Sequence, residues 1–235
     1  MTLLALDKVD VFYRDLQATF AVDLQLAMGE AVAIIGANGA GKSTLLRAII
    51  GLTPARRGAI TFDGADITRL GCDTIARRGV ALVPEGRRLF GSLTVEENLR
   101  VGMARARPGP WGLDAVYELF PAMREFRSNL AEDLSGGQQQ MVAISRALLT
   151  NPKLLLCDEV SLGLAPTVIA DIYACFDRIR ATGVSLILVE QDIVRARAAS
   201  DRLYCLLKGR VTLHGRSEAV SLEAIRDAYF GEEAA

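Results

Sequence analysis

The chain lacks the features that would predict a metal centre or a membrane span. It has a single histidine, His214, and its four cysteines, at positions 72, 157, 175 and 205, form no C-x-x-C pair. A zinc site is therefore not expected, and the cysteines are predicted to be free thiols of a reducing compartment. No run of about 18 apolar residues could cross a bilayer, and the N-terminus lacks the build of a signal peptide. We expect no membrane-spanning segment.

Neither basic nor acidic residues predominate in the chain. The formal net charge is -1 and no long basic or acidic run occurs, which excludes binding of nucleic acid by bulk electrostatics. Hydrophobic residues make up 51% of the 235, enough for one large domain or for a core with an inserted lobe. The positive mean hydropathy fits a sheet buried on both faces, and it would also fit a docking surface for a hydrophobic partner.

Strand and helix patterns alternate along both ends of the chain, which predicts an α/β fold with a mostly parallel sheet. Glu30–Ile35 is a short apolar run before a glycine, typical of a central strand, and a helix is expected from near Lys42 toward Ile50. The first sixty residues and a closing hairpin around Lys208-Gly209 predict an antiparallel β edge. Residues 86–150 are mostly helical. We expect a single domain over 1–235, with the α/β core in 1–85 and 151–235 and a helical subdomain in 86–150.

The segment after the Glu30–Ile35 strand reads GANGAGKS and leads into a helix. Successive backbone N–H groups of such a loop, together with the free donors of a helix N-terminus, bind polyphosphate. The Lys42 ammonium can reach the β- and γ-phosphates, and the Ser43 hydroxyl can ligate Mg²⁺. This pattern in this context predicts a P-loop nucleotide-binding site for ATP and Mg²⁺. The residues expected to bind the nucleotide here are Gly36, Ala37, Asn38, Gly39, Ala40, Gly41, Lys42, Ser43 and Thr44.

A second apolar strand, Leu154–Glu159, ends in two carboxylates. Ligands of a parallel sheet gather at the carboxyl ends of its strands. Asp158 is therefore expected to help hold Mg²⁺, and Glu159 to orient or deprotonate the attacking water. An Asp-Glu pair on its own would be an ordinary loop, so this interpretation depends on the phosphate loop.

The sequence LSGGQ at Leu134–Gln138 precedes the acidic strand, and with these motifs the chain resembles the nucleotide-binding subunits of ABC transporters. Ser135 and the glycines after it also precede the apolar run Met141–Leu149, so they offer donors at a helix N-terminus. The resemblance implies that Ser135, Gly136, Gly137 and Gln138 close on the ATP held by a second subunit. That arrangement is a head-to-tail dimer with two ATPs.

The resemblance assigns further residues and includes two departures. Tyr13 matches the aromatic residue that stacks on adenine, with a strand aromatic in the core as the alternative. Glu85 stands where most of the family has the glutamine that contacts Mg²⁺. Gln191 stands where most have a switch histidine, and His214 comes too late to replace it. Glutamine cannot take a proton near neutral pH. Glu159 is therefore expected to be the base and Gln191 to sense the γ-phosphate.

The segments VPEGRRLF, TVEENL, LGLAP and LVEQ resemble the second ATPase subunit of branched-chain amino acid importers. The resemblance implies two membrane permease subunits, a sister ATPase subunit or homodimer, an external solute-binding protein, and a peripheral position at the cytoplasmic face of the inner membrane. Close relatives import urea, amides or aromatic acids. ABC ATPases of DNA repair or translation and a non-hydrolysing regulatory subunit remain open. The surface around Glu85–Phe90 and the helical subdomain is expected to dock the permeases.

Overall fold

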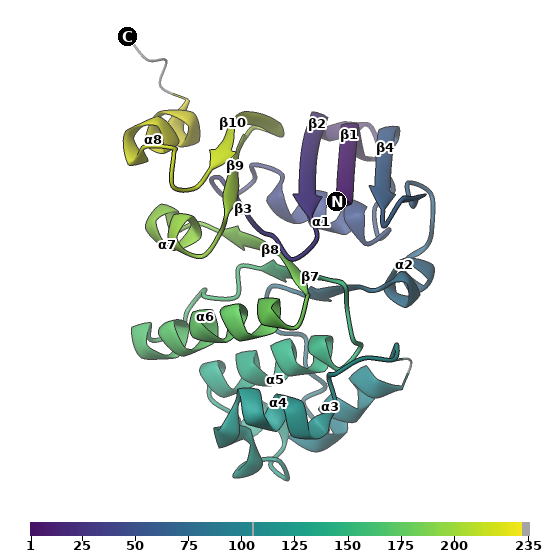
Figure 1. Ribbon diagram of the computed structural model, residues 1–235, viewed down its shortest axis with the longest axis vertical. Coiled ribbons are helices and arrows are strands. Elements are labelled where there is room, and N and C mark those ends of the chain that lie inside the picture. Colours follow the sequence, from purple (N-terminus) through teal and green to yellow (C-terminus); the bar gives the residue numbers. More distant parts are fainter. Residues whose placement is uncertain (105, 232–235) are drawn as a thin grey trace. The chain divides into compact units, whose positions relative to one another are not determined.

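The computed structural model describes residues 1–104 and 106–231 (Figure 1). The chain forms two compact units. The first contains Met1–Ile75 and Ser185–Ala235, and the second contains Ala76–Val184. Helix α2 (Cys72–Arg78) spans the point where the chain passes from one unit to the other. The expected division of a core from a helical subdomain at residues 85/86 and 150/151 is a different one, and it stays a prediction.

The first unit contains the antiparallel sheet that the sequence predicts at its edge. Its strands β1 (Thr2–Tyr13), β2 (Leu16–Ala27), β4 (Arg57–Phe62) and β5 (Ala65–Asp66) follow the order β2-β1-β4-β5, and Figure 1 shows the first three side by side. Buried and exposed residues alternate along most of β2, as expected for a sheet with one covered face. Asp63 and Gly64, both with positive φ, form the tight turn between β4 and β5.

The same unit holds the parallel strands around the predicted phosphate loop. Strand β3 (Ala31–Ile35) is wholly buried and lies between β8 (Ser185–Glu190) and β9 (Arg202–Leu207), with both of which it pairs in parallel. Strand β10 (Arg210–Arg216) closes the antiparallel hairpin with β9, which confirms the expected turn at Lys208-Gly209. The helices of this unit are α1 (Lys42–Ile49), α7 (Ile193–Ala198) and α8 (Leu222–Phe230).

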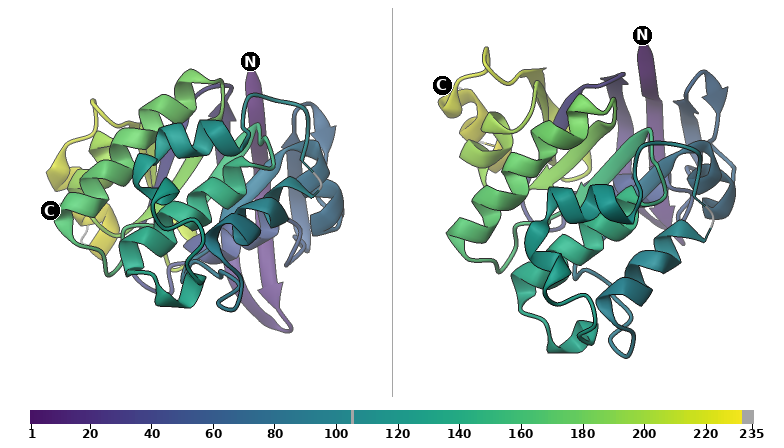
Figure 2. Two further views of the ribbon diagram at one scale, coloured as in Figure 1. Left: turned by 90° about the horizontal axis from the view of Figure 1, so that it is seen from below. Right: turned by 60° about the horizontal axis from the view of Figure 1, so that its bottom comes forward.

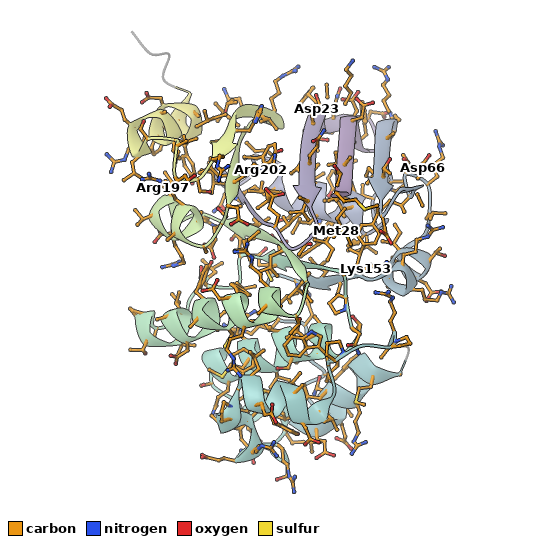
Figure 3. All side chains as sticks on the ribbon, in the orientation of Figure 1. Asp23, Met28, Asp66, Lys153, Arg197 and Arg202 are labelled. Carbon is orange, nitrogen blue, oxygen red and sulfur yellow. The ribbon has the colours of Figure 1, made fainter. Side chains whose placement is uncertain are left out.

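An ion pair holds β9 to the turn before β3. Arg202, labelled in Figure 3, donates from Nε and Nη2 to the Glu30 carboxylate at 2.5 and 2.9 Å, and from Nη2 to the Gln25 carbonyl oxygen at 2.7 Å. Burial acts to raise the pKa of Glu30, but the hydrogen bonds from Arg202 and the Ala27 amide outweigh it and lower that pKa. The pair fixes the N-terminal end of β3, whose other end leads into the phosphate loop.

The second unit contains the remaining parallel strands and most of the helices. Strands β6 (Val80–Val83) and β7 (Leu154–Asp158) pair in parallel. Helices α3 (Val95–Met103) and α5 (Gly136–Leu148) pack side by side, as Figure 2 shows. The helices and 3₁₀ turns are α3 (Val95–Met103), α4 (Leu113–Leu119), Pro121–Arg124, Ala131–Asp133, α5 (Gly136–Leu148) and α6 (Pro166–Ala181).

Capping residues fix where two of these helices begin. Thr94 and Glu97 form a capping box at the start of α3. Helix α5 begins at Gly136, directly after Ser135, where the sequence predicts a helix N-terminus. The reason is a second capping box, in which the Ser135 hydroxyl accepts from the Gln138 amide and the Gln138 side chain accepts from the Ser135 amide. The two glycines of LSGGQ therefore lie inside the first helical turn.

Candidate nucleotide site

The phosphate loop begins at Gly36, directly after the buried strand β3. Gly36 has φ of 153°, and a Cβ atom there would collide with the carbonyl oxygen of Leu206 on β9. The loop ends at Gly41, which is the N-cap of α1 in a left-handed conformation and makes no side-chain capping hydrogen bond. Gly41 has no side chain that could cap α1, which is compatible with a helix N-terminus that binds an anion.

The Lys42 side chain is folded into this loop. It is 4% exposed, and its Nζ donates to the carbonyl oxygens of Gly36 at 2.7 Å and Ala37 at 3.2 Å. An ammonium held at the loop by two carbonyls is already oriented toward the phosphate position, and it can exchange those oxygens for phosphate oxygens. Ser43 and Thr44 follow on α1, half-buried beside the loop.

Tyr13 lies at the end of β1 and is held against α1. Its hydroxyl is 3.4 Å from the Thr44 hydroxyl, and Arg47 Nη1 donates to it at 3.4 Å. Burial acts to raise the pKa of Tyr13, but hydrogen bonds with Thr44 and Arg47 outweigh it and lower that pKa. The residue is 39% exposed, so the alternative of a core aromatic does not apply. An exposed ring fixed beside the phosphate loop can stack on a base.

Gln191 follows β8 and contacts the phosphate loop directly. Its Nε2 donates to the Asn38 Oδ1 at 3.0 Å. The side-chain amide of Gln191 is therefore hydrogen-bonded to a residue of the phosphate loop. The parallel pairing of β8 with β3 explains the contact, because Glu190 and Ile35 are register partners and each strand leads into its loop at that level.

The turn that carries Gln191 is held by Arg195. Its Nη1 is 3.8 Å from the carboxylate of Glu190 and its Nη2 is 3.3 Å from that of Asp192, the two neighbours of Gln191. Asp192 is also the N-cap of α7, because its carboxylate accepts from the Arg195 amide at 2.9 Å. Glu190 is 2% exposed, so the ion pair compensates a buried charge.

The acidic pair lies in the second unit, at the carboxyl end of β7. Asp158 is the last residue of this fully buried strand and is 7% exposed. Glu159 follows with φ of 50°, a left-handed conformation that is uncommon for a residue with a long side chain. Such strain is frequent where a side chain must be aimed from a strand end.

Glu85 lies at the same end of the neighbouring strand. The register of β6 on β7 pairs Val83 with Cys157, so Pro84 and Glu85 leave the strand where Asp158 ends β7. Glu85 is exposed. Both carboxylates therefore belong to the edge of the strand pair at which α/β proteins bind ligands.

The LSGGQ segment combines a cap with close helix packing. Its Gly137 lies against α6, where an added Cβ would come within 2.7 Å of Val168 Cγ1. The Ser135 hydroxyl is exposed at the helix N-terminus, and its capping bond to the Gln138 amide is 3.4 Å long. This long bond leaves the segment able to present a hydroxyl and helix amides to an anion.

The exposed segment Glu85–Phe90 is tied to the helices of its own unit. Arg146 on α5 donates from Nη2 to the carbonyl oxygens of Arg87 and Arg88, at 3.2 and 2.7 Å, and its guanidinium lies over the Phe90 ring. Arg87 Nη1 donates to the Gln139 side chain at 3.2 Å. Phe90 is nevertheless 51% exposed. The segment is therefore an ordered surface with an apolar tip.

Asn98 on α3 anchors the end of this segment. It is fully buried, and its carboxamide accepts from the Phe90 amide at 2.9 Å and donates to the carbonyl oxygens of Phe90 and Thr94, both at 3.0 Å. Asn98→Ala should lower the free energy of unfolding by about 2–4 kcal/mol, because it removes these buried side-chain hydrogen bonds and takes from the Phe90 amide its Asn98 acceptor. Urea unfolding would measure it. Exposed Asn129→Ala is the matched control, and an equal loss in both variants would contradict the anchoring role.

The comparisons with known proteins decide the family. A family model described as ABC transporter matches residues 20–161. The chain belongs to the ABC transporter ATPase family. It is 44% identical over 97% of its length to the whole of BraG, a high-affinity branched-chain amino acid transport ATP-binding protein of Pseudomonas aeruginosa. It is 36% identical over 88% of its length to 89% of LivF of Archaeoglobus fulgidus, a probable branched-chain amino acid transport ATP-binding protein.

Solved ABC cassettes have the same fold. One is a dimeric ATP-binding cassette in a post-hydrolysis state with ADP and Pi. It has a TM-score of 0.83 and 26% identity, and the match covers 93% of this chain and all of that one. Another cassette, in its ADP conformation, has a TM-score of 0.79 and 27% identity over 99% of this chain and all of that one. The expected P-loop NTPase fold is confirmed, and the chain is an ATPase that binds ATP.

The structure groups the predicted site residues within each unit. In the first unit Tyr13, Asn38, Lys42 and Gln191 lie around the phosphate loop, and in the second Glu85 and Asp158 share one strand edge. The sequence did not predict the side-chain role of Asn38 or the clamp by Arg195. A basic residue three positions after an N-cap aspartate was the available signal for the clamp. In the described part of the chain no helix is long and apolar enough to cross a membrane.

Proposed function

We propose that this chain is the ATP-hydrolysing subunit of an importer of branched-chain or other hydrophobic amino acids, held peripherally at the cytoplasmic face of the inner membrane. The observation that carries the proposal is the 44% identity to BraG, which extends over 97% of this chain and all of that protein. The phosphate loop, the LSGGQ segment at Leu134–Gln138 (the signature segment) and the acidic end of β7 are all present, each with a defined local geometry. Importers of urea, amides or aromatic acids, and non-transport ABC ATPases, are the alternatives.

In the proposed mechanism the site residues have distinct roles. Lys42 and the loop amides bind the phosphates, and Tyr13 stacks on adenine. Ser43, Asp158 and Glu85 would hold Mg²⁺, since hydroxyl and carboxylate oxygens are its preferred ligands. Glu159 accepts the proton of the attacking water, and Gln191 donates to the γ-phosphate. The signature segment of a second ATPase subunit, identical or sister, completes the site with Ser135, Gly136, Gly137 and Gln138.

The proposed assembly adds two permease subunits and an external solute-binding protein. We assign the permease contact to the Glu85–Phe90 surface, because it is ordered by Arg146 and Asn98 yet presents an exposed phenyl ring. An apolar side chain held rigidly at a surface is typical of an interface anchor.

The test is reconstitution with candidate permeases and binding protein in proteoliposomes. Leucine, isoleucine or valine outside should stimulate ATP hydrolysis and be taken up. Stimulation by urea or an amide alone would support a related importer instead. Failure of the chain to associate with any multi-span partner would favour the non-transport reading.

Phe90→Ala should reduce co-purification with the permeases about tenfold or more, in line with the loss of a buried aromatic anchor. The ATPase activity of the isolated chain should be unchanged. Phe230→Ala is the matched control, because Phe230 on α8 is 67% exposed. Equal retention of the partners by both variants would count against the assigned surface.

A further inference from the structure

The contact between Gln191 and Asn38 joins two amides at the phosphate loop. In a hydrogen bond between carboxamides, one group must donate through nitrogen and the other accept through oxygen. Here Gln191 supplies Nε2 and Asn38 supplies Oδ1, at 3.0 Å. The nitrogen end of the Gln191 carboxamide therefore faces the loop, and this is the end that carries donors.

This orientation matters because a carboxamide has two chemically opposite ends. If the nitrogen of the carboxamide faces the γ-phosphate, its N–H groups stabilise the anion. If the oxygen faces it, a partial negative charge lies against the anion. A histidine in this place presents a ring N–H, but glutamine can rotate about its last torsion with little preference. A glutamine at this position consequently needs a partner that fixes the rotamer of its side chain.

The backbone of Gln191 is also fixed. Arg195 reaches the carboxylates on both sides of it, at 3.8 Å for Glu190 and 3.3 Å for Asp192. Asp192 caps α7, so the turn and the helix share one anchor. The guanidinium therefore limits the movement of the turn, and the Asn38 oxygen limits the rotation of the side chain.

We propose that Asn38 and Arg195 are positioning residues that hold the donor end of the Gln191 carboxamide toward the γ-phosphate position. The proposal rests on the proposed role of Gln191 as the γ-phosphate contact. In it Asn38 acts through its side chain, beyond the backbone role of its loop. Because Gln191 serves the γ-phosphate alone, the pair should set the preference for ATP over ADP and leave ADP binding nearly unchanged.

The experiment is a double-mutant cycle on the isolated chain, titrated with Mg²⁺ and either a non-hydrolysable ATP analogue or ADP. Gln191→Ala should raise the Kd for the ATP analogue about tenfold, the effect of losing a hydrogen bond to a charged group. Asn38→Ala should raise this Kd about threefold, and in the Gln191→Ala background it should have no further effect. The Kd for ADP should stay within about twofold throughout, as it should for the control Gln25→Ala.

The results distinguish the γ-phosphate contact of Gln191 from the positioning roles of Asn38 and Arg195. If Gln191→Ala leaves the preference for ATP intact, the proposed γ-phosphate contact is wrong. If Gln191→Ala removes that preference but Asn38→Ala does not, or if the two losses simply add, the positioning role of Asn38 is overturned. Arg195→Ala should also lower the preference, with unchanged binding of ADP. If that variant loses affinity for both the ATP analogue and ADP, or for neither, the positioning role of Arg195 is overturned.

Discussion

Glu159→Gln should lower the turnover of ATP by about 100- to 10,000-fold, the range for losing a general base. The amide keeps the shape of the side chain but cannot accept the proton of the attacking water. Glutamine has the same length and branching as glutamate, so it should adopt the backbone conformation of this position, with its φ of 50°, equally well. ATP binding should be retained, and single-turnover quench measurements with radiolabelled ATP would show nucleotide bound but uncleaved.

The neighbouring carboxylates supply the matched controls for this variant. Asp158→Asn should weaken Mg²⁺-dependent ATP binding, because the buried carboxylate that we propose as a Mg²⁺ ligand would lose its charge. Glu85→Gln, which restores the residue that most of the family has, should leave turnover within a few-fold of the parent. Hydrolysis by Glu159→Gln at the parental rate would refute the assignment of Glu159 as the base. The base would then have to be sought among the residues around Gln191.

The sequence predicted the fold well wherever local pattern and tertiary context agree. Strand β3 follows from an apolar run, and the structure has it at Ala31–Ile35, within the predicted Glu30–Ile35. Helix α5 begins at Gly136, at the helix N-terminus expected around Ser135, because the capping box of Ser135 and Gln138 offsets the low helix propensity of glycine. The short helix α2 has few periodic residues and was not predicted.

The site was predictable only as far as its motifs are contiguous. The loop residues 36–44 and the acidic pair are each read from one short segment. Gln191 and Asn38 are separated by 153 positions, and only the parallel pairing of β3 with β8 brings their loops together. The clamp by Arg195 likewise depends on the side-chain conformations of one turn. No pattern of residue types specifies such contacts without the strand register.

Ser135→Asp should abolish ATP hydrolysis, with a loss of about 100-fold or more if the signature segment contacts phosphate. Aspartate caps a helix about as well as serine, so α5 should begin at the same place and the fold should be kept. The added carboxylate, however, would oppose the negative γ-phosphate of the ATP bound by a second subunit. Ser221→Asp is the matched control, because Ser221 caps α8 in the same way, accepting from the Ala224 amide at 3.1 Å.

The same variant tests whether each site is shared between two subunits. In a head-to-tail dimer, a Lys42→Ala chain still offers an intact signature segment, and a Ser135→Asp chain still offers an intact phosphate loop. Mixing the two inactive chains should therefore restore up to about a quarter of the parental rate per chain, since half of the dimers would be mixed and each would have one complete site. Phosphate release from the mixture, measured against each variant alone, gives the answer. No recovery, in a mixture shown by cross-linking to contain mixed dimers, would mean that the signature segment serves the ATP of its own chain.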